Sequence, residues 1–312
     1  MTQLGTLDLP DDEVAIRVRG LRKVYKVSRG VTKAAVDGVD LDVARGEILA
    51  LLGPNGAGKT TTTEILEGHR HADAGSVSVL GADPKHGSLP WRARIGIVLQ
   101  TASDAGDLTV SEATSLYARM YPDPADPDSV LERVGLSEKR KARIASLSGG
   151  QRRRLDVALG IIGQPELLFL DEPTTGFDPA ARRQFWSLIE DLRTDGTTIL
   201  LTTHYLDEAE RLADRIAVIA AGRLVACGPA SELGGDARSA AVITWQDAGG
   251  PPQQVQSEHP TAEVLRLAAS YDGEIPGLQV RRTSLEDVYL ELVGGSESTP
   301  AQHSTQRQGV SA

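Results

Sequence analysis

The sequence contains a single cysteine, Cys227, among its 312 residues. One cysteine excludes an internal disulfide and any metal cluster that several thiolates would hold. We expect Cys227 to be a small buried apolar residue, because free cysteine is among the most buried residue types. The scarcity of cysteine also fits a cytosolic setting, where disulfides are rare.

The chain also lacks a long apolar run. The best candidate, 155–170, is interrupted by two carboxylates, a glutamine and a proline. A membrane-spanning helix needs about 18 or more consecutive apolar residues. Segment 1–13 is acidic and has neither the basic start nor the apolar core of a signal peptide. We therefore expect any membrane association to be peripheral.

Positive charge is in deficit. Lysine and arginine together number 33 against 43 aspartates and glutamates, which gives a formal net charge of -10. Because a general nucleic-acid binder needs a basic surface, we expect no nucleic-acid partner. With 40% hydrophobic residues, a chain of this length can form one large domain and a smaller one.

The segment GPNGAGKT, residues 53–60, has the pattern of a phosphate-binding loop. Its glycines allow successive N–H groups to point into one concavity, and a helix that starts near Lys59 adds its positive end. Lys59 can reach the β- and γ-phosphates of a nucleotide, and the Thr60 hydroxyl can ligate a bridging Mg²⁺. A glycine-rich turn without a ligand is the alternative. The apolar strand expected at 47–52 and the helix expected at 61–67 favour the phosphate site.

A second motif, LSGGQ, occupies residues 147–151. Ser148 is a good N-cap for the helix expected next, and the two glycines leave the first turn of that helix bare. Its N–H groups form a second anion site, for which phosphate is again the expected ligand. The three arginines at 152–154 either strengthen the local positive field or form a solvated helix face.

Three apolar strands end in polar residues. They are IGIVLQ at 95–100, LLFLDE at 167–172 and TTILLTTH at 197–204, ending in Gln100, Glu172 and His204. Ligands of open α/β sheets bind at the edge formed by the carboxyl ends of the strands. We expect Asp171 to contact Mg²⁺ and Glu172 to act as a base. The alternatives are that Asp171 and Glu172 only cap the end of a strand, and that His204 is a structural residue.

The rest of the pattern divides the chain into regions. Residues 14–45 alternate as short strands between turn residues, which predicts an antiparallel sheet beside the phosphate-binding loop. Helical spacing over about 109–164 predicts an inserted helical segment. The first domain ends near Pro229, and 231–293 is predicted to be a small α+β extension. The polar segment 294–312 is expected to be disordered.

The extension ends in a second amphipathic pattern, SLEDVYLELV, which predicts a helix capped by Thr283 or Ser284. Four apolar residues share one face of this helix: Leu285, Val288, Tyr289 and Leu292. We interpret it as a packing element.

Together these motifs resemble the ATP-binding subunit of ABC transporters over residues 16–228. The resemblance implies an α/β fold with a P-loop NTPase core, an antiparallel β subdomain and a helical insertion, forming an ATP-binding domain at 14–229. GPNGAGKT looks like the family's Walker A motif, LLFLDE like Walker B, and LSGGQ like its signature. Gln100, Asp178 and His204 resemble the Q-loop glutamine, the D-loop aspartate and the switch histidine. Phe177 departs from the leucine that is more usual in the D-loop.

The resemblance also implies functional residues and the cofactors ATP and Mg²⁺. The implied catalytic residues are Lys59, Gln100, Glu172 and His204, and the implied metal ligands are Thr60, Gln100 and Asp171. The residues implied to hold ATP are Tyr25, Gly53, Pro54, Asn55, Gly56, Ala57, Gly58, Lys59, Thr60, Thr61, Ser148, Gly149, Gly150, Gln151 and Asp178. Among them, Tyr25 takes the place of the aromatic residue that stacks on adenine.

The family's mechanism requires partners. If the helical insertion holds Ser148 far from Lys59, each signature must cover the ATP of a second copy in a head-to-tail dimer. The chain would then energise a separate transmembrane permease from the cytoplasmic face of the membrane. Residues 231–293 resemble the extension of the branch that exports drugs, lipids and polysaccharides, which includes antibiotic-resistance exporters.

An ATP-gated signalling or scaffold ATPase, coupled to a membrane protein without solute transport, is the alternative. Relatives that act on DNA carry a long coiled coil between the Walker motifs, and those that act on ribosomes carry two ATP-binding domains. Neither feature occurs in this sequence. The permease, and not this chain, determines which substance is transported.

Overall fold

The structure is a computed structural model, and it describes residues 5–28, 31–99, 107–233, 241–246, 250–282 and 284–297. Three sequence predictions lie outside these residues. They concern Gln100, Thr283 as a candidate helix cap, and most of the predicted tail, residues 298–312.

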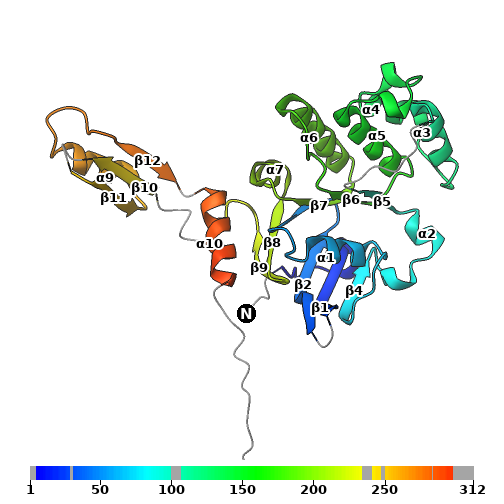
Figure 1. Cartoon of the computed structure of the whole chain (residues 1–312), viewed down its shortest axis with the longest axis horizontal. Helices are drawn as coiled ribbons and strands as arrows, with labels where there is room; N and C mark the ends of the chain where they lie inside the picture. Colours follow the sequence, from blue (N-terminus) through cyan, green and yellow to red (C-terminus); the bar gives the residue numbers. More distant parts are fainter. Residues whose placement is uncertain are drawn as a thin grey trace, which may run out of the picture.

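A six-stranded sheet forms the centre of the molecule (Figure 1). Its strands, in spatial order, are β5 (Ile95–Val98), β6 (Leu167–Asp171), β7 (Thr198–Thr203), β3 (Ile48–Leu52), β8 (Arg215–Ala220) and β9 (Arg223–Gly228). The first five are parallel, and β9 is antiparallel to β8. Because helices or a second sheet cover both faces, the parallel strands are nearly continuous apolar runs. In β3, Leu49 and Leu51 enter one core cluster while the other three residues enter another.

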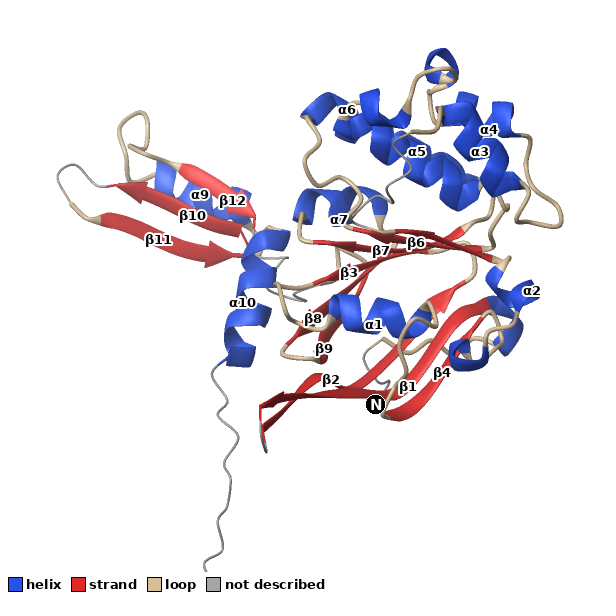
Figure 2. Cartoon of the chain, turned by 45° about the vertical axis from the view of Figure 1, so that its right-hand side comes forward, coloured by secondary structure: helices blue, strands red, loops and turns tan. Residues whose placement is uncertain are grey.

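A three-stranded antiparallel sheet packs beside this central sheet. Its order is β2 (Val31–Ala44), β1 (Val14–Ser28) and β4 (Ala74–Val79). Helix α1 (Lys59–Leu66) lies between the two sheets (Figure 2), and its buried Ile65 and Leu66 join the core that both sheets share. The predicted α/β class and the antiparallel subdomain are therefore confirmed.

Most of the other helices cover the opposite face of the central sheet (Figure 2). They are α3 (Val110–Ala118), α4 (Pro127–Arg133), α5 (Gly149–Ile161), α6 (Pro179–Thr194) and α7 (Leu206–Leu212). Shorter pieces are α2 (Leu89–Arg92) and the 3₁₀ turns Asp11–Glu13, Pro84–His86, Ser137–Lys139 and Ile144–Ser146. The segment predicted as a helical insertion contains α3, α4 and α5, and α3 begins at a capping box formed by Thr109 and Glu112.

A small lobe projects from this body (Figure 1). It consists of an antiparallel sheet and one helix: β11 (Pro252–Ser257), β10 (Ala241–Gln246), β12 (Gln279–Arg282) and α9 (Pro260–Ala268). Buried Ala241 and Ile243 of β10, with Leu267 of α9, form its apolar interior.

The last helix, α10 (Leu285–Glu297), packs on the body around the central sheet instead of on the lobe. Its Leu285 and Val288 are buried in the same core cluster as the central sheet. Ser284 caps it, because its hydroxyl accepts the N–H of Asp287 at 3.2 Å while the Asp287 carboxylate accepts the N–H of Ser284 at 2.9 Å. Disorder was expected from residue 294, whereas α10 extends to Glu297.

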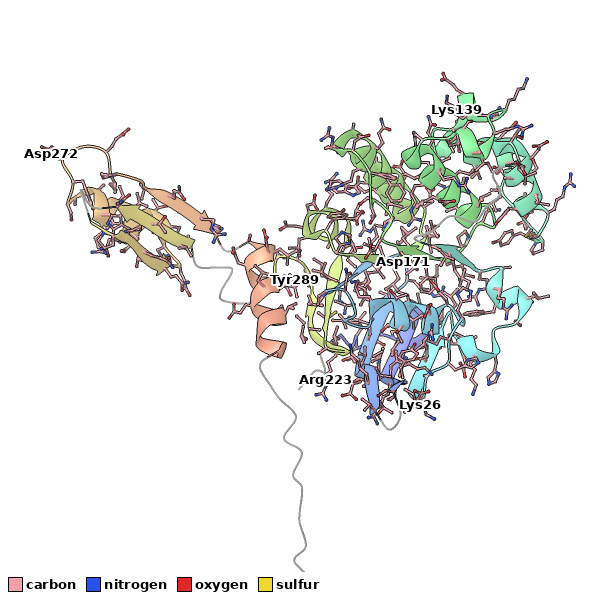
Figure 3. The ribbon with its side chains drawn as sticks, in the orientation of Figure 1. Lys26, Lys139, Asp171, Arg223, Asp272 and Tyr289 are labelled. Atoms are coloured by element: carbon pink, nitrogen blue, oxygen red, sulfur yellow. The ribbon has the colours of Figure 1, made fainter. Side chains whose placement is uncertain are left out.

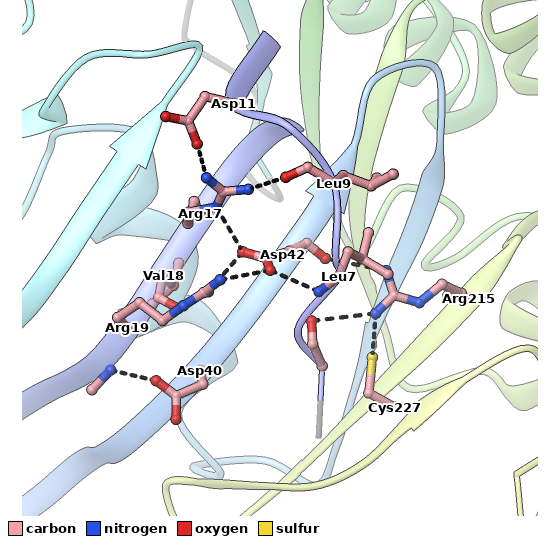
Figure 4. A network of polar contacts seen from close by, with 12 residues as sticks. Leu7, Leu9, Asp11, Arg17, Val18, Arg19, Asp40, Asp42, Arg215 and Cys227 are labelled. Carbon is pink, nitrogen blue, oxygen red and sulfur yellow. Dashed lines mark hydrogen bonds and ion pairs between the residues drawn. The ribbon is translucent and has the colours of Figure 1, made fainter. Parts of the chain in front are cut away.

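The N-terminal segment is fixed by a polar network (Figure 4). Buried Asp42 accepts bonds from both terminal nitrogens of Arg19, at 2.7 and 2.8 Å, and from the N–H of Leu7 at 2.8 Å. In the same network Arg215 donates to the Sγ of Cys227 at 3.1 Å. Cys227 was expected to be a small buried apolar residue, but it is half-buried at the edge of a core cluster and takes part in this polar network. Its thiol is a hydrogen-bond acceptor, and burial raises its pKa.

Replacement of Leu285 tests whether α10 stabilises the body around the central sheet. We expect Leu285→Ala to lower the free energy of unfolding by about 2–5 kcal/mol, because a buried leucine is lost and a cavity remains. Leu290 of the same helix is 60% exposed, and Leu290→Ala should change stability by less than about 0.5 kcal/mol. Urea unfolding followed by tryptophan fluorescence measures both. Equal small effects would place α10 outside the cooperative unit.

Candidate nucleotide-binding site

The loop at 53–60 joins β3 to α1 along a path that requires glycine at two points. Gly58 has φ +113°, and a Cβ there would lie 2.3 Å from the carbonyl oxygen of Ala35. A Cβ at Gly53 would lie 2.3 Å from the carbonyl oxygen of Ile219. Neither backbone can move away without disturbing a strand. The loop therefore fits against the sheets only without these side chains.

Lys59 is the buried cation of this loop, with 6% of its surface exposed. Its Nζ donates to the carbonyl oxygen of Gly53 at 2.6 Å and to that of Pro54 at 3.3 Å. Burial lowers the pKa of Lys59, while the charges of Glu172 and Asp171 oppose that shift. An anionic ligand in the loop would stabilise this charge more strongly than neutral carbonyls do.

A cavity of about 490 Å³ opens over the loop. Its lining comes from β1, β2, the loop, the start of α1 and Glu172: Tyr25, Val27, Lys33, Ala35, Pro54, Asn55, Gly56, Gly58, Lys59, Thr60, Thr61 and Glu172. Tyr25 contributes an aromatic ring to this lining, and the guanidinium of Arg70 lies 5.3 Å from the centre of that ring. The cavity thus combines an aromatic surface, bare N–H groups and one carboxylate.

Asp171 is the last residue of β6 and Glu172 follows it, and β6 lies two positions from β3 in the sheet. Figure 3 shows Asp171 near the middle of the body, where the helical part meets the strand ends. Its Oδ1 accepts the hydroxyl hydrogen of Thr202 on β7. Glu172 has φ +44°, and its N–H donates to both the carbonyl and the hydroxyl oxygen of Thr202, each at 3.1 Å. This left-handed conformation, costly for a non-glycine residue, turns the carboxylate towards the cavity.

His204 lies directly after β7, and its Nδ1 is 3.4 Å from Oε2 of Glu172. The Thr175 hydroxyl is 3.5 Å from the same oxygen. The structure therefore brings Lys59, Glu172 and His204 to one edge of the sheet, as the strand-end pattern predicted. Such grouping of a base candidate and a second polar group beside an anion site is typical of active sites.

The LSGGQ segment forms the start of α5. Ser148 caps this helix: its hydroxyl accepts the N–H of Gln151 at 3.3 Å, and Oε1 of Gln151 accepts the N–H of Ser148 at 3.1 Å. Residues 148–151 are not part of the lining of the cavity over the loop. A Cβ at Gly149 would meet no atom within 4 Å, so the described part of the chain does not itself require glycine there.

Asp178 is the N-cap of α6. Its Oδ1 accepts the N–H groups of Ala180 and Ala181, each at 2.9 Å, and these bonds lower the pKa of the carboxyl, with the bond from Ala181 the larger cause. The neighbouring Phe177 packs edge-on against Phe185, with ring centres 5.7 Å apart. The unusual phenylalanine of the predicted D-loop is thus a packing residue.

Sequence reasoning missed two buried charged residues near the strand ends. Arg153 was expected either in a local positive field or on a solvated face, but it is 7% exposed and donates to backbone carbonyls. The available signal was its i, i+4 spacing to Val157 on the apolar face of α5. Glu208 is fully buried on α7 and accepts from Nε1 of Trp186 at 3.3 Å. Burial raises the pKa of Glu208.

A second cavity, of about 400 Å³, lies between the end of β5 and the helices α3 and α5. It is lined by Glu67, Gly68, His69, Pro84, Trp91, Arg92, Ile95, Ile97, Val98, Leu99, Tyr117, Tyr121, Asp156, Leu159 and Gly160. Most of this lining is apolar or aromatic. Glu67 and Asp156 add two carboxyls, and burial is the largest cause that raises the pKa of each.

The phosphate-binding loop, the strand-end carboxylates and the capped glycine-rich helix define a P-loop ATPase of the cassette class. A family profile described as ABC transporter matches residues 36–175. Daunorubicin resistance ATP-binding protein DrrA3 of Streptomyces coeruleorubidus is 37% identical over 310 residues, which cover 90% of this chain and 96% of that protein. The chain belongs to the ATP-binding subunits of ABC transporters, and its reaction is ATP hydrolysis.

Further relatives and solved structures agree with this assignment. Nod factor export ATP-binding protein I of Ralstonia nicotianae is 38% identical, covering 89% of this chain and 94% of its own length. A structure of an ATP-binding subunit of an ABC transporter aligns with a TM-score of 0.66 at 23% identity, over 89% of this chain and 99% of that one. A dimeric cassette with ADP and phosphate aligns with a TM-score of 0.63 at 23% identity, over 69% and 98%. Both structures support the fold.

Among the described residues, no helix combines the length and the apolar character that crossing a membrane requires.

Replacement of Glu67 tests whether burial in the second cavity raises the pKa of this carboxyl. Its pKa is raised from 4.5 to about 7, first by burial and then by the charges of Asp171 and Glu64. Between these pH values the unfolded chain ionises while the folded chain stays protonated, so stability falls as the pH rises. Glu67→Gln does not ionise. Relative to the wild type, it should therefore gain up to about 3 kcal/mol in free energy of unfolding between pH 4.5 and pH 8.

Urea unfolding at pH 5 and pH 8 measures this difference. Glu132→Gln is the matched control, because Glu132 is exposed on α4 and its loss should leave the pH dependence unchanged. If wild type and Glu67→Gln lose the same stability over this range, Glu67 ionises normally in the fold.

Proposed function

We propose that this ATPase hydrolyses ATP at the loop 53–60 and drives export through a separate membrane permease. The observation that carries the proposal is the position of Glu172. Its carboxylate lines the same cavity as Lys59 and lies 3.4 Å from Nδ1 of His204. A carboxylate held beside an anion site can polarise a water that attacks the γ-phosphate, with His204 placed to contact that phosphate.

The cavity offers a suitable surface for each part of ATP. Lys59 and the N–H groups of the loop neutralise the phosphates. The ring of Tyr25 offers a stacking surface for adenine, and stacking of this kind is worth about 1–3 kcal/mol. Gln100 is proposed as a sensor of the γ-phosphate because it follows Leu99 at the end of β5, and its side chain lies outside the described residues.

The oxygen donors near the loop fit Mg²⁺. The Thr60 hydroxyl lines the cavity, and the Asp171 carboxylate is fixed by Thr202 at the adjacent strand end. Hydroxyl, carboxylate and amide oxygens are the ligands that a hard cation prefers. We assign Thr60, Asp171 and Gln100 as the residues that hold the ion, directly or through water. When bound, Mg²⁺ neutralises charge on the β- and γ-phosphates.

The active unit is proposed to be a head-to-tail dimer of this chain. Residues 148–151 lie outside the cavity over the loop, and Gly149 faces open space. A helix N-terminus whose glycine has no constraint within its own chain suits close approach of an external phosphate. Asp178, exposed at the start of α6, is proposed to lie near the dimer seam. Similar cassettes whose structures are described as dimers support this arrangement.

Export is proposed from the relatives, which act in daunorubicin resistance and Nod factor export by their names. These names favour transport over the signalling or scaffold alternative. A drug-like, lipid or saccharide substrate is the expected class. The second cavity, with Tyr117, Tyr121 and exposed Leu99 around it, is proposed to receive a cytosolic segment of the permease. Apolar side chains and one basic residue in that segment would match its lining and its two carboxyls.

Glu172→Gln tests the proposed composite site, in which the loop of one copy and the LSGGQ segment of the other hold the same ATP. A general base contributes about 10²–10⁴-fold, so turnover should fall by this factor while ATP binding is preserved. The variant should accumulate as an ATP-bound dimer because hydrolysis no longer opens it. Gel filtration with ATP and Mg²⁺ measures the dimer, and the wild type with ADP is the control. A variant that stays monomeric with ATP at saturating concentration would contradict the dimer.

Reconstitution tests transport. Inside-out vesicles that carry a candidate permease should show ATP-dependent uptake when the wild-type chain is added, and none with Glu172→Gln. The probes are daunorubicin, a fluorescent phospholipid and a labelled oligosaccharide. ATP-dependent movement of any one supports export and fixes the substrate class. ATPase stimulation by the permease without movement of any probe would favour the signalling alternative.

A further inference from the structure

One buried arginine connects the signature helix to the strand ends that carry the reacting groups. Arg153 lies on the second turn of α5, five residues after Ser148. Its Nε donates to the carbonyl oxygen of Pro173 at 3.0 Å, and its Nη2 donates to that of Asp171 at 2.6 Å. Its Nη1 donates to the carbonyl oxygen of Leu99. One side chain therefore holds three separate backbone carbonyls.

These carbonyls belong to the two segments on which the proposed chemistry depends. Asp171 and Pro173 stand on either side of Glu172, and Leu99 is the residue before Gln100. The ladder between β5 and β6 ends at the pair Val98 and Leu170. Beyond this pair, strand pairing no longer fixes the spacing of the two chain segments. Arg153 bridges them where the ladder stops.

The environment of Arg153 favours a fixed position over a solvated one. The side chain is 7% exposed, and burial lowers the pKa of its guanidinium. The charges of Asp156, Asp171 and Glu208 oppose that shift and stabilise the cation. A guanidinium offers five N–H donors in a rigid planar fork, so it can hold several carbonyls at once. A lysine ammonium is a compact charge that cannot donate these three hydrogen bonds in the same planar arrangement.

We propose that Arg153 is a positioning residue that sets the position of Ser148 according to the positions of Leu99 and Glu172. Displacement of either strand end moves the carbonyls that Arg153 holds, and the rigid start of α5 moves with them. When one nucleotide site contacts the γ-phosphate, the change thereby reaches α5 of the same chain. In the proposed dimer, the start of this helix faces the nucleotide bound to the other copy. This inference rests on the proposed dimer.

The test compares Arg153→Lys with Arg154→Lys in the wild type and in Glu172→Gln. Both changes keep the charge on the same helix turn. Arg154 is a matched control, because within the described part of the chain it donates long bonds to the carbonyls of Val134 and Gly135, at 3.5 and 3.4 Å. Equilibrium binding gives the ATP affinity of the dilute monomer. Analytical ultracentrifugation gives the dimer dissociation constant, and steady-state kinetics give kcat and KM.

We expect Arg153→Lys to raise the ATP-bound dimer dissociation constant about tenfold and to lower kcat about tenfold, because at least one charge-assisted hydrogen bond is lost. The ATP affinity of the monomer and KM should change less than about twofold, because Lys59 and the loop are not touched. Arg154→Lys should resemble its parent in every measurement.

Three outcomes would overturn the inference. Arg153→Lys could dimerise and turn over like Arg154→Lys, which would show that the bridge transmits nothing. It could lose thermal stability and monomer ATP affinity to the same extent as dimer affinity, which would show a general packing role. If Glu172→Gln itself forms no ATP-bound dimer, the composite site fails, and the role of Arg153 fails with it.

Discussion

Thr202 fixes the reacting edge of this molecule through the last hydrogen bonds of a parallel strand pair. Its carbonyl and hydroxyl oxygens both accept the N–H of Glu172 at 3.1 Å, and its hydroxyl donates to Asp171. These bonds stabilise a left-handed backbone at Glu172 that a glutamate rarely adopts. Without that conformation the carboxylate would follow the direction of β6 and would not face the loop. His204, two residues beyond Thr202, approaches the same carboxylate because β7 runs beside β6.

The order of the strands in the sheet then brings the carboxylates of Asp171 and Glu172 close to the phosphate-binding loop. β3, which leads into the loop, is separated from β6 by β7 alone. All three strands are parallel, so their carboxyl ends lie along one edge. Burial of Lys59 is tolerated there, because Glu172 and Asp171 provide opposing charge across the cavity. The LSGGQ segment on α5 lies outside the lining of the cavity over the loop, which is consistent with the proposed site shared between two copies.

The C-terminal region joins two different parts of the molecule. Its sheet and α9 have their own small interior, whereas α10 returns to the body and packs through Leu285 and Val288 on the central core. The extension at 231–293 was predicted from sequence as one appended unit. Its last helix instead anchors the lobe to the ATPase. Helix α10 contacts β8 and α7 of the central body.

The sequence by itself determined the local devices: the loop 53–60, the capped start of α5 and the strands that end in Asp171 and His204. Each depends on residues within a few positions of one another, so composition and spacing suffice. The tertiary structure alone decided the burial of Arg153, the bond from Arg215 to Cys227 and the docking of α10. In each case the partner is distant along the chain or on another element. Charge and hydropathy are the same for a solvated arginine and a bridging one, and only packing distinguishes them.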